Sequence, residues 1–542
     1  MNSLKRFNLS GIVNERLSKE RLRVLWGENK PGLLLGAIAA LCFAAWAAFK
    51  QLSYPVIPEG LEWIDPPPEY ISETSLFMAC CFAILLGLGL WRCFRHFELK
   101  LHRRQLLVLG AGLMLGMAVR YCLLPEVTHD YKGFLYAWAE RFRNEGWDAI
   151  KNTGDYTMPY RYFVFLITRL PVDPLYLYKL GSVVFDVLAV MAALRLSGRF
   201  NAGPWRKTIL ALAVFFTPTV LLNGAYWAQC DVIYAFFCLM CLIYALEERP
   251  VLSVIMAGLA VCIKLQTVFF LPMLAIFWIA KKVKLKHFVI LPAVYLAVNL
   301  PAMLSGVPLF ELGRDYEGKT RIGGLIGIYT GQAGQYSGKL SSGAPSMFEL
   351  IDWQEANRDT MPDEQYRAVA KKNAALSRMG IGLAAGFILI LVTLAWFKRK
   401  SMSDKALLLL SACMVLGIPW LLPSMHGRYF FTADMLCVII AVLFPVYAYI
   451  GPLQVFASYG AYYNYLRHFG YLYGQYLPAP HLPIQTFALH RHSYAVLIVL
   501  IAVMVMACRE IVILKPQGKP KGRSQLPRRK NIPKKLSGGN KR

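Results

Sequence analysis

Residues 379–397 read MGIGLAAGFILILVTLAWF, an apolar run of 19 residues without a charge. Residues 33–49 form a second run of the same kind. A helix needs about 20 mainly apolar residues to cross the hydrocarbon core of a bilayer. Strands of a membrane barrel would instead alternate apolar and polar side chains over about 10 residues. The sequence therefore predicts an all-α, polytopic helical membrane protein.

The composition of the whole chain points the same way. Of the 542 residues, 56% are hydrophobic and 17% are charged, whereas soluble proteins carry about 25% charged residues. An ordinary soluble enzyme is excluded by this composition, and so is a disordered chain, which needs low hydrophobicity.

About fourteen stretches are apolar enough to be helical spans. They are 32–49, 75–94, 105–124, 175–195, 208–223, 230–246, 251–264, 266–280, 287–304, 377–397, 405–422, 430–447, 452–466 and 492–513. The neighbouring runs 251–264 and 266–280 could be one long helix. The Lys264–Gln266 interruption between them favours two spans.

The net charge of +27 follows the predicted topology. Cytoplasmic loops of membrane proteins collect Lys and Arg. Threading fourteen spans from a cytoplasmic N-terminus puts every basic segment inside and returns the C-terminus to the cytoplasm. These segments are 1–30, 92–104, 195–207, 281–286, 398–405 and the tail 515–542. We expect a multi-pass protein of a bacterial plasma membrane that contacts membrane lipids and binds no nucleic acid.

The same threading leaves the polar material on the outer face. The outer segments are 51–74, 125–173, 305–376 and 423–429. Residues 131–151 place aromatic and charged side chains on opposite sides of a helix, which predicts a helix in the interface with its aromatic face in the lipid. Residues 160–170 predict a second interfacial helix. Any chemistry is therefore expected outside.

The twelve cysteines show no metal-ligand spacing. Most of them lie within apolar runs, where a buried thiol behaves as a small hydrophobic side chain. We predict no disulfide framework. The first 30 residues are polar and basic, which is not the pattern of a cleavable signal peptide.

Ionisable residues near membrane depth are costly and are usually functional. Six of them fall at the outer boundary in this threading: Asp130, Asp231, Lys264, His426, Arg428 and Asp434. The alternative is structural, because charges at helix ends can snorkel and aspartates can cap helices. We expect a structural role for Arg120 and Asp186. The gathering of the six on one side favours a cavity that faces outward.

The residue types in this set suit a substrate that carries a phosphate on a lipid tail. Lys264, His426 and Arg428 would supply a cationic clamp for the phosphate at the membrane surface. Asp130 would supply a carboxylate base beside that charge.

The same residues occur within an ordered series of motifs. These are Asp130, Met158-Pro159-Tyr160, Trp227-Ala228-Gln229-Cys230-Asp231, Ile263-Lys264-Leu265-Gln266 and Met425-His426-Gly427-Arg428-Tyr429. The series resembles the polytopic glycosyltransferases of the GT-C superfamily, and more closely the prokaryotic mannosyltransferases related to the GPI-anchor second mannosyltransferase. The chain departs from that family where Ala228 replaces a Gly and Gly427 replaces a Glu.

The resemblance implies a hexosyltransferase that moves a sugar, mannose or another hexose, from a polyprenyl-phosphate donor. The acceptor would be a hydroxyl of a glycan, lipid or protein on the outer face. Asp130 would be the general base of an inverting reaction, and Lys264, His426 and Arg428 would hold the phosphate. The residues expected to bind sugar or acceptor are His129, Tyr160, Gln229, Asp231, Gln266 and Tyr429. We expect no resident cofactor and no metal ligands, with a divalent metal left open.

The resemblance also divides the chain into regions. Residues 1–104 hold the cytoplasmic N-terminus and two spans, 105–450 form the catalytic core, 451–513 hold the last spans, and 514–542 form the basic tail. The alternative function is a lipid-linked sugar flippase or another polytopic transporter. The absence of a visible inverted repeat and the one-sided polar material count against it.

Overall fold

The computed structural model of the chain describes residues 19–52, 68–96, 102–151, 155–314, 320–334, 338–468, 471–472, 475–476 and 488–513. This part is mostly helical, with three two-stranded sheets and the loops that connect these elements. The prediction of an all-α, polytopic helical protein is confirmed. Parts of the predicted segments 1–30, 51–74 and 305–376, and all of the tail 514–542, lie outside the described residues.

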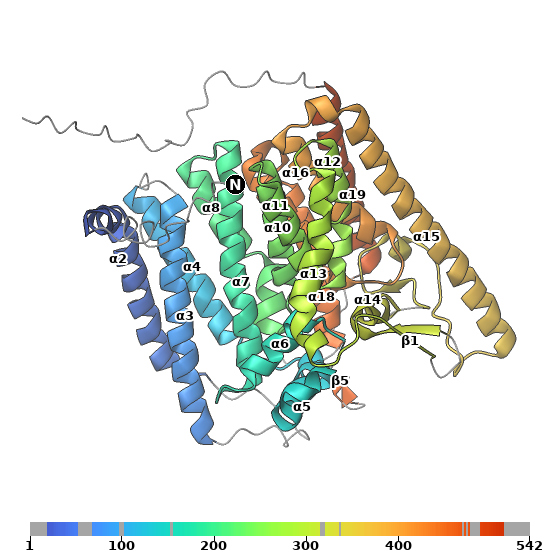
Figure 1. Ribbon diagram of the computed structural model, residues 1–542, viewed down its shortest axis with the longest axis horizontal. Coiled ribbons are helices and arrows are strands. Elements are labelled where there is room, and N and C mark those ends of the chain that lie inside the picture. Colours follow the sequence, from blue (N-terminus) through green and yellow to red (C-terminus); the bar gives the residue numbers. More distant parts are fainter. Residues whose placement is uncertain are drawn as a thin grey trace, which may run out of the picture.

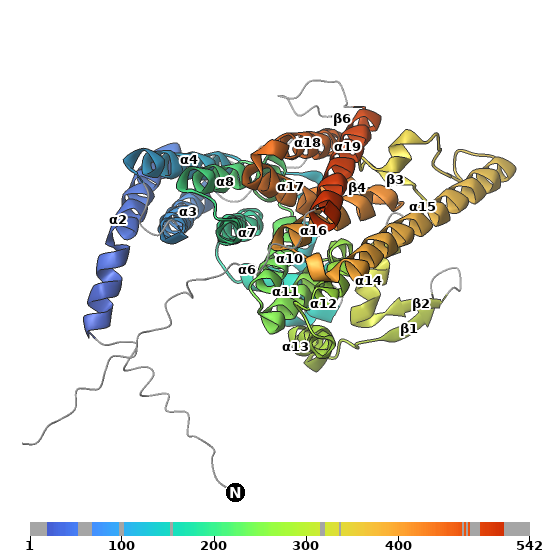
Figure 2. The same cartoon turned by 90° about the horizontal axis from the view of Figure 1, so that it is seen from above.

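Three helices form one end of the molecule (Figure 2). They are α2 (Lys19–Lys50), α3 (Pro68–His96) and α4 (Arg103–Cys122). The α2 and α3 backbones touch at Gly36 and Gly87, where a Cβ on Gly36 would lie 2.5 Å from the Gly87 carbonyl oxygen. Small residues permit such close crossings of helices within a membrane. Arg120 of α4 and Asp186 form a fully buried ion pair at 2.8 Å, in line with the structural role expected for them.

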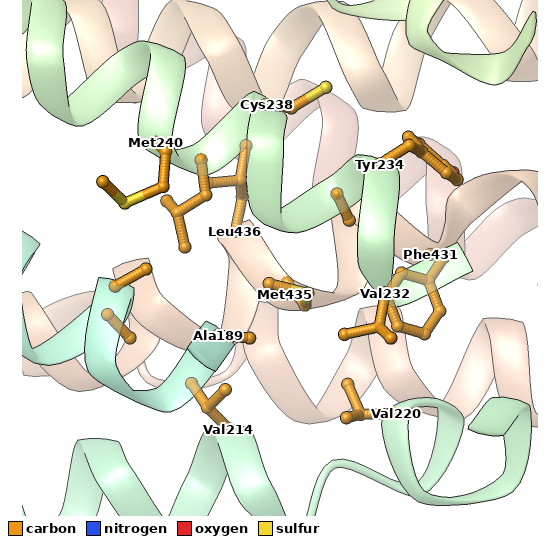
Figure 3. Close-up of a cluster of buried hydrophobic side chains, with 14 of the residues drawn as sticks. Ala189, Val214, Val220, Val232, Tyr234, Cys238, Met240, Phe431, Met435 and Leu436 are labelled. Atoms are coloured by element: carbon orange, nitrogen blue, oxygen red, sulfur yellow. The ribbon is translucent and has the colours of Figure 1, made fainter. Parts of the chain in front are cut away.

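The middle of the molecule is a bundle whose short helices surround one core. Its elements are α7 (Pro174–Ser197), α8 (Pro204–Phe215), α9 (Pro218–Leu221), η5 (Leu222–Tyr226), α10 (Asp231–Leu246), α11 (Pro250–Ile263), η6 (Leu265–Phe269), α12 (Pro272–Ile279) and α13 (Ile290–Leu304). Several begin with proline, which suits the first turn because its missing N–H needs no partner there. Figure 3 shows part of this core, where α10 and α17 (Phe431–Leu443) meet α7, α8 and α9.

The C-terminal helices close the bundle and carry an outer layer. They are α15 (Asp363–Phe397), α16 (Asp404–Leu421), α17, α18 (Ile450–His468) and α19 (Leu489–Cys508). The outer layer holds α14 (Gly324–Gly334), the hairpin of β1 (Glu311–Arg314) and β2 (Thr320–Gly323), and the parallel pair β3 (Ser341–Ser342) and β4 (Met425–His426). A small hairpin joins β5 (Tyr471–Leu472) to β6 (Gln475–Tyr476). In Figure 1, α15 slants along one side of the molecule.

The predicted spans coincide with helices, but only some are long. Within the described residues, eight helices are long and apolar enough to cross a membrane, or nine if the bent pair Pro204–Phe215 and Pro218–Tyr226 is one span. Three further apolar helices, Asp231–Leu246, Pro250–Ile263 and Leu265–Ile279, are shorter. The predicted spans 430–447 and 452–466 correspond to α17 and α18, which fall outside both groups. The chain is therefore built as a multi-pass membrane protein whose central helices are short.

Ion pairs connect the predicted inner loops at one end of the molecule. Arg195 binds Glu247 at 2.6 Å, and Arg199 binds Asp404. Lys282 lies 3.5 Å from Asp404 as well. Residues from four loops that the threading placed inside thus meet, and Figure 1 shows the ends of α7, α12 and α16 together, away from α5 (Tyr136–Glu145) and α6 (Met158–Ile167).

The prediction that the aromatic face of residues 131–151 lies in the lipid was wrong for most of that face. This segment is η2 (Tyr131–Leu135), α5 and η3 (Gly146–Lys151), and its aromatic side chains pack against protein except Phe134, which is exposed. Tyr131 and Phe142 are fully buried. The Trp147 ring stacks on Tyr162 of α6 at 5.7 Å. The predicted helix 160–170 is α6, whose inner face is also buried. Aromatic residues suit a protein core and a lipid interface equally, so the pattern alone misplaced them.

Candidate functional site

A cavity of about 760 Å³ lies at the end of the molecule away from the basic loops. Eight of the ten residues predicted for the site line it: His129, Asp130, Gln229, Lys264, Gln266, His426, Arg428 and Tyr429. The structure thus brings together residues that are up to 300 positions apart in the chain. Tyr160 and Asp231 do not line the cavity, although Tyr160 packs on Tyr156, which does, with ring centroids 4.6 Å apart.

Asp130 is the most heavily hydrogen-bonded carboxylate of the cavity. It begins η2 and is 7% exposed. Its Oδ2 accepts hydrogen bonds from the Trp227 indole at 2.9 Å and from the Gln229 amide at 2.7 Å. Its Oδ1 accepts one from the Tyr465 hydroxyl at 2.7 Å. These three donors fix the plane of the carboxylate at the cavity wall.

The left-handed backbone conformation of one residue positions two of these donors. Ala228, between Trp227 and Gln229, has a φ of 61°. A left-handed conformation costs a non-glycine residue roughly 1–2 kcal/mol. It turns the chain so that the side chains on both sides of it reach the same carboxylate.

The guanidinium of Arg428 completes the wall beside Asp130. Its Nη1 lies 3.9 Å from Oδ2 of Asp130 and donates to the side-chain oxygen of Gln229. The same oxygen accepts a hydrogen bond from the Tyr156 hydroxyl at 2.9 Å. The guanidinium also lies over the Trp227 ring, 5.6 Å from its centroid. A planar cation is thereby held close to the carboxylate, at the edge of the cavity.

The second cation of the cavity, Lys264, is already paired. It stands in extended conformation between α11 and η6. Its ammonium donates to Asp231 at 2.5 Å, and both side chains are almost fully buried. The other oxygen of Asp231 accepts from Asn223 at 2.7 Å. Asp231 therefore lies behind Lys264 and balances its charge.

His426 is neutral in this environment. Burial, and then the positive charges of Arg428 and Lys264, lower the pKa of His426 well below its usual value of 6.5. Its Nδ1 accepts the backbone N–H of Arg428 at 3.4 Å. The ring packs against Tyr465, with centroids 4.7 Å apart. His426 can therefore offer a hydrogen bond to a phosphate, but not the positive charge that the sequence interpretation gave it.

The segment after α14 forms another part of the cavity wall. Strand β3 pairs in parallel with β4, matching Ser341 with Met425 and Ser342 with His426. The backbone N–H of Ser424 donates to the Leu340 carbonyl at 2.9 Å. This anchoring brings Glu349 to the cavity, where burial raises the pKa of its carboxyl. The part of the predicted segment 305–376 next to the site is therefore fixed to the loop that carries His426 and Arg428.

Sequence reasoning missed several cavity residues. Tyr156 and Tyr465 line the cavity but were not predicted for the site. Trp227, which donates to Asp130 without lining the cavity, was quoted only as part of a motif. Tyr465 belongs to α18, outside the region that resembles the related family. The available signal was the tyrosine-rich run 459–465 in a predicted span, which also suits a membrane interface. Among the described residues, no three His, Cys, Asp or Glu side chains gather closely enough to hold a metal ion.

Comparison with known protein families gives one match. Residues 156–312 match the model of glycosyltransferase family 87. The match indicates a membrane glycosyltransferase. It covers less than a third of the chain, including Gln229, Asp231 and Lys264 but neither Asp130 nor Arg428. No curated protein and no solved structure matches the chain.

Proposed function

We propose that the protein transfers a hexose, mannose being the first candidate, from a polyprenyl-phosphate donor to an acceptor hydroxyl on the outer face of the membrane. The observation that carries this proposal is the position of Asp130. Its carboxylate is held by three hydrogen bonds at a cavity wall that also contains Arg428 and Lys264. A base beside a phosphate-binding group is the combination that such a transfer needs.

The donor phosphate would bind next to Arg428. A guanidinium forms paired hydrogen bonds with phosphate oxygens, and its charge stabilises the phosphate as it leaves. Lys264 adds a second cation, an ammonium whose charge is partly balanced by Asp231. The neutral ring of His426 would donate a hydrogen bond. The lipid tail would remain in the bilayer, because the cavity lies at one end of the helical bundle.

The acceptor hydroxyl would approach Asp130 from the cavity. Asp130 takes the hydroxyl proton while the acceptor oxygen forms a bond to C1 of the sugar. The bond from C1 to the phosphate oxygen breaks, and the polyprenyl phosphate leaves with both electrons of that bond. Attack opposite to the leaving group inverts the configuration at C1.

The test uses purified protein with polyprenyl-phosphate mannose, glucose and arabinose, each labelled in the sugar. General-base catalysis contributes about 10²–10⁴-fold, so Asp130→Asn should lose transfer by about that factor. Asparagine keeps an oxygen for Trp227 or Gln229 and is expected to leave the fold intact.

Asp155→Asn is the matched control, because Asp155 is another carboxylate in the cavity lining. It should stay within a few-fold of the wild-type rate. A fully active Asp130→Asn protein would remove Asp130 as the base. Movement of an intact labelled donor across liposomes without any bond formation would instead support a flippase.

A further inference from the structure

The two oxygens of Asp130 have different surroundings. Oδ2 is held by Trp227 and Gln229, which are both buried. Oδ1 accepts its hydrogen bond from Tyr465, which is half-buried and lines the cavity. Because Oδ2 also faces Arg428 at 3.9 Å, the lone pairs open to a substrate belong to Oδ1.

The Tyr465 hydroxyl therefore stands where an acceptor hydroxyl must arrive. A general base has to come within hydrogen-bonding distance of the proton that it removes, about 2.6–3.2 Å between heavy atoms. The Tyr465 oxygen lies 2.7 Å from Oδ1. An acceptor hydroxyl that binds to the same oxygen from the cavity meets the tyrosine first.

The position of Tyr465 is built into the packing of α18. Its ring lies 4.5 Å from the Trp227 ring and 4.7 Å from the His426 ring, centroid to centroid. Nearer the N-terminus of α18, Gln454 and Ser458 both donate to Oδ1 of the buried Asp434, at 3.0 and 2.7 Å. These contacts hold the helix and with it the Tyr465 ring.

We propose that Tyr465 occupies the acceptor position on Asp130 and thereby suppresses hydrolysis of the donor until an acceptor displaces its hydroxyl. This inference rests on the proposed function. In the unwanted reaction, water at Oδ1 gives its proton to Asp130 while its oxygen bonds to C1 of the sugar. The bond from C1 to phosphate breaks, releasing free sugar and polyprenyl phosphate. Tyr465 acts through Asp130 and is a positioning residue.

The test measures two products from the same labelled donors, free sugar and sugar transferred to acceptors of a membrane fraction. In Tyr465→Phe the ring and its packing remain but the hydroxyl is gone. We expect the ratio of hydrolysis to transfer to rise by about 10-fold or more, the factor that corresponds to one hydrogen bond to a charged group. The KM for the acceptor should fall, because its competitor is removed.

Tyr462→Phe is the control on the same helix. Tyr462 also packs on Trp227, at 5.2 Å, but its hydroxyl accepts from Asn223 at 3.0 Å and it does not line the cavity. Its ratio of hydrolysis to transfer should stay at the wild-type value. An unchanged ratio in a folded, active Tyr465→Phe protein overturns the inference and leaves the proposed function standing. If wild-type protein neither transfers nor releases sugar from any of the three donors, the proposed function fails and the inference falls with it.

Discussion

Inside the protein, the positive charge of Lys264 is balanced by the carboxylate of Asp231. Removing one member of a buried ion pair leaves an uncompensated charge and typically costs about 3–5 kcal/mol. Asp231→Asn and Lys264→Met should therefore each lower the melting temperature in detergent clearly. The double variant should recover much of that loss, because neither charge remains.

Transfer activity separates the two roles of this pair. The double variant should stay inactive with every donor, since the ammonium that we propose to lie beside the donor phosphate is gone. A double variant that is as unstable as the singles would show that the residues do not act as a pair. Arg195→Met with Glu247→Gln is a control pair at the opposite end, which is more exposed and should cost less.

His426 gives the site a pH dependence of stability with a definite sign. Its pKa is lowered in the folded protein, so the unfolded chain binds the proton first as the pH falls. The stability contributed by the neutral ring is present above about pH 6.5 and is lost as the pH falls from there towards the folded pKa. Relative to His426→Gln, the wild type should therefore lose melting temperature between about pH 6.5 and pH 5. Parallel curves for the two proteins would contradict this.

Single residues of the site could be predicted where a charge interrupts an apolar run. Lys264 and Asp231 stand out in this way, and the structure brings them into contact. Tyr465 could not be found by the same rule. A tyrosine near the end of a span is ordinary at a membrane interface, and its contact with Asp130 joins residues 335 positions apart.

At the scale of elements, the close approach of α18 requires a glycine at position 427. A Cβ on Gly427 would lie 2.8 Å from the Ala461 Cβ and 2.9 Å from the Gly343 carbonyl oxygen. The loop that carries His426 and Arg428 is thus pressed between β3 and α18. A side chain at this position has no room unless one of these neighbours moves.

Gly427→Ala should therefore weaken the site through α18. Overpacking typically costs about 1–3 kcal/mol, and relief by movement of α18 would draw Tyr465 away from Asp130. We expect a lower melting temperature together with a higher ratio of hydrolysis to transfer. Adding Ala461→Gly removes the opposing methyl group and should restore part of both, because the contact with the Gly343 carbonyl oxygen remains. Gly382→Ala on α15 has nothing within 4 Å of the added methyl group and is the neutral control.

The positions of helices follow from the sequence better than their surroundings do. Every predicted span coincides with helical residues, because long apolar runs have few other structures inside a bilayer. The outer helix at 131–151 was located correctly, but its aromatic face was assigned to lipid. Periodicity shows that a helix has an apolar face, whereas the partner of that face depends on the tertiary packing of α6 and α7.

At the scale of the whole molecule, the distribution of charge predicts how the protein is oriented in the membrane. The loops joined by Arg195, Arg199 and Lys282 lie at one end and the cavity at the other. Basic loops remain in the cytoplasm. The cavity is therefore expected to face outward, and Asn357, exposed in the outer segment, should face outward with it.

A labelling experiment decides this orientation. Asn357→Cys should react with a membrane-impermeant maleimide in intact cells, whereas Lys286→Cys, exposed in a basic loop, should react only after the membrane is broken. The native cysteines set the background, and unmodified protein measured in parallel subtracts it. If only Lys286→Cys reacted in intact cells, the protein would have the opposite orientation in the membrane. The cavity would then face the cytoplasm, and Asp130 would have to receive its donor and acceptor from that side.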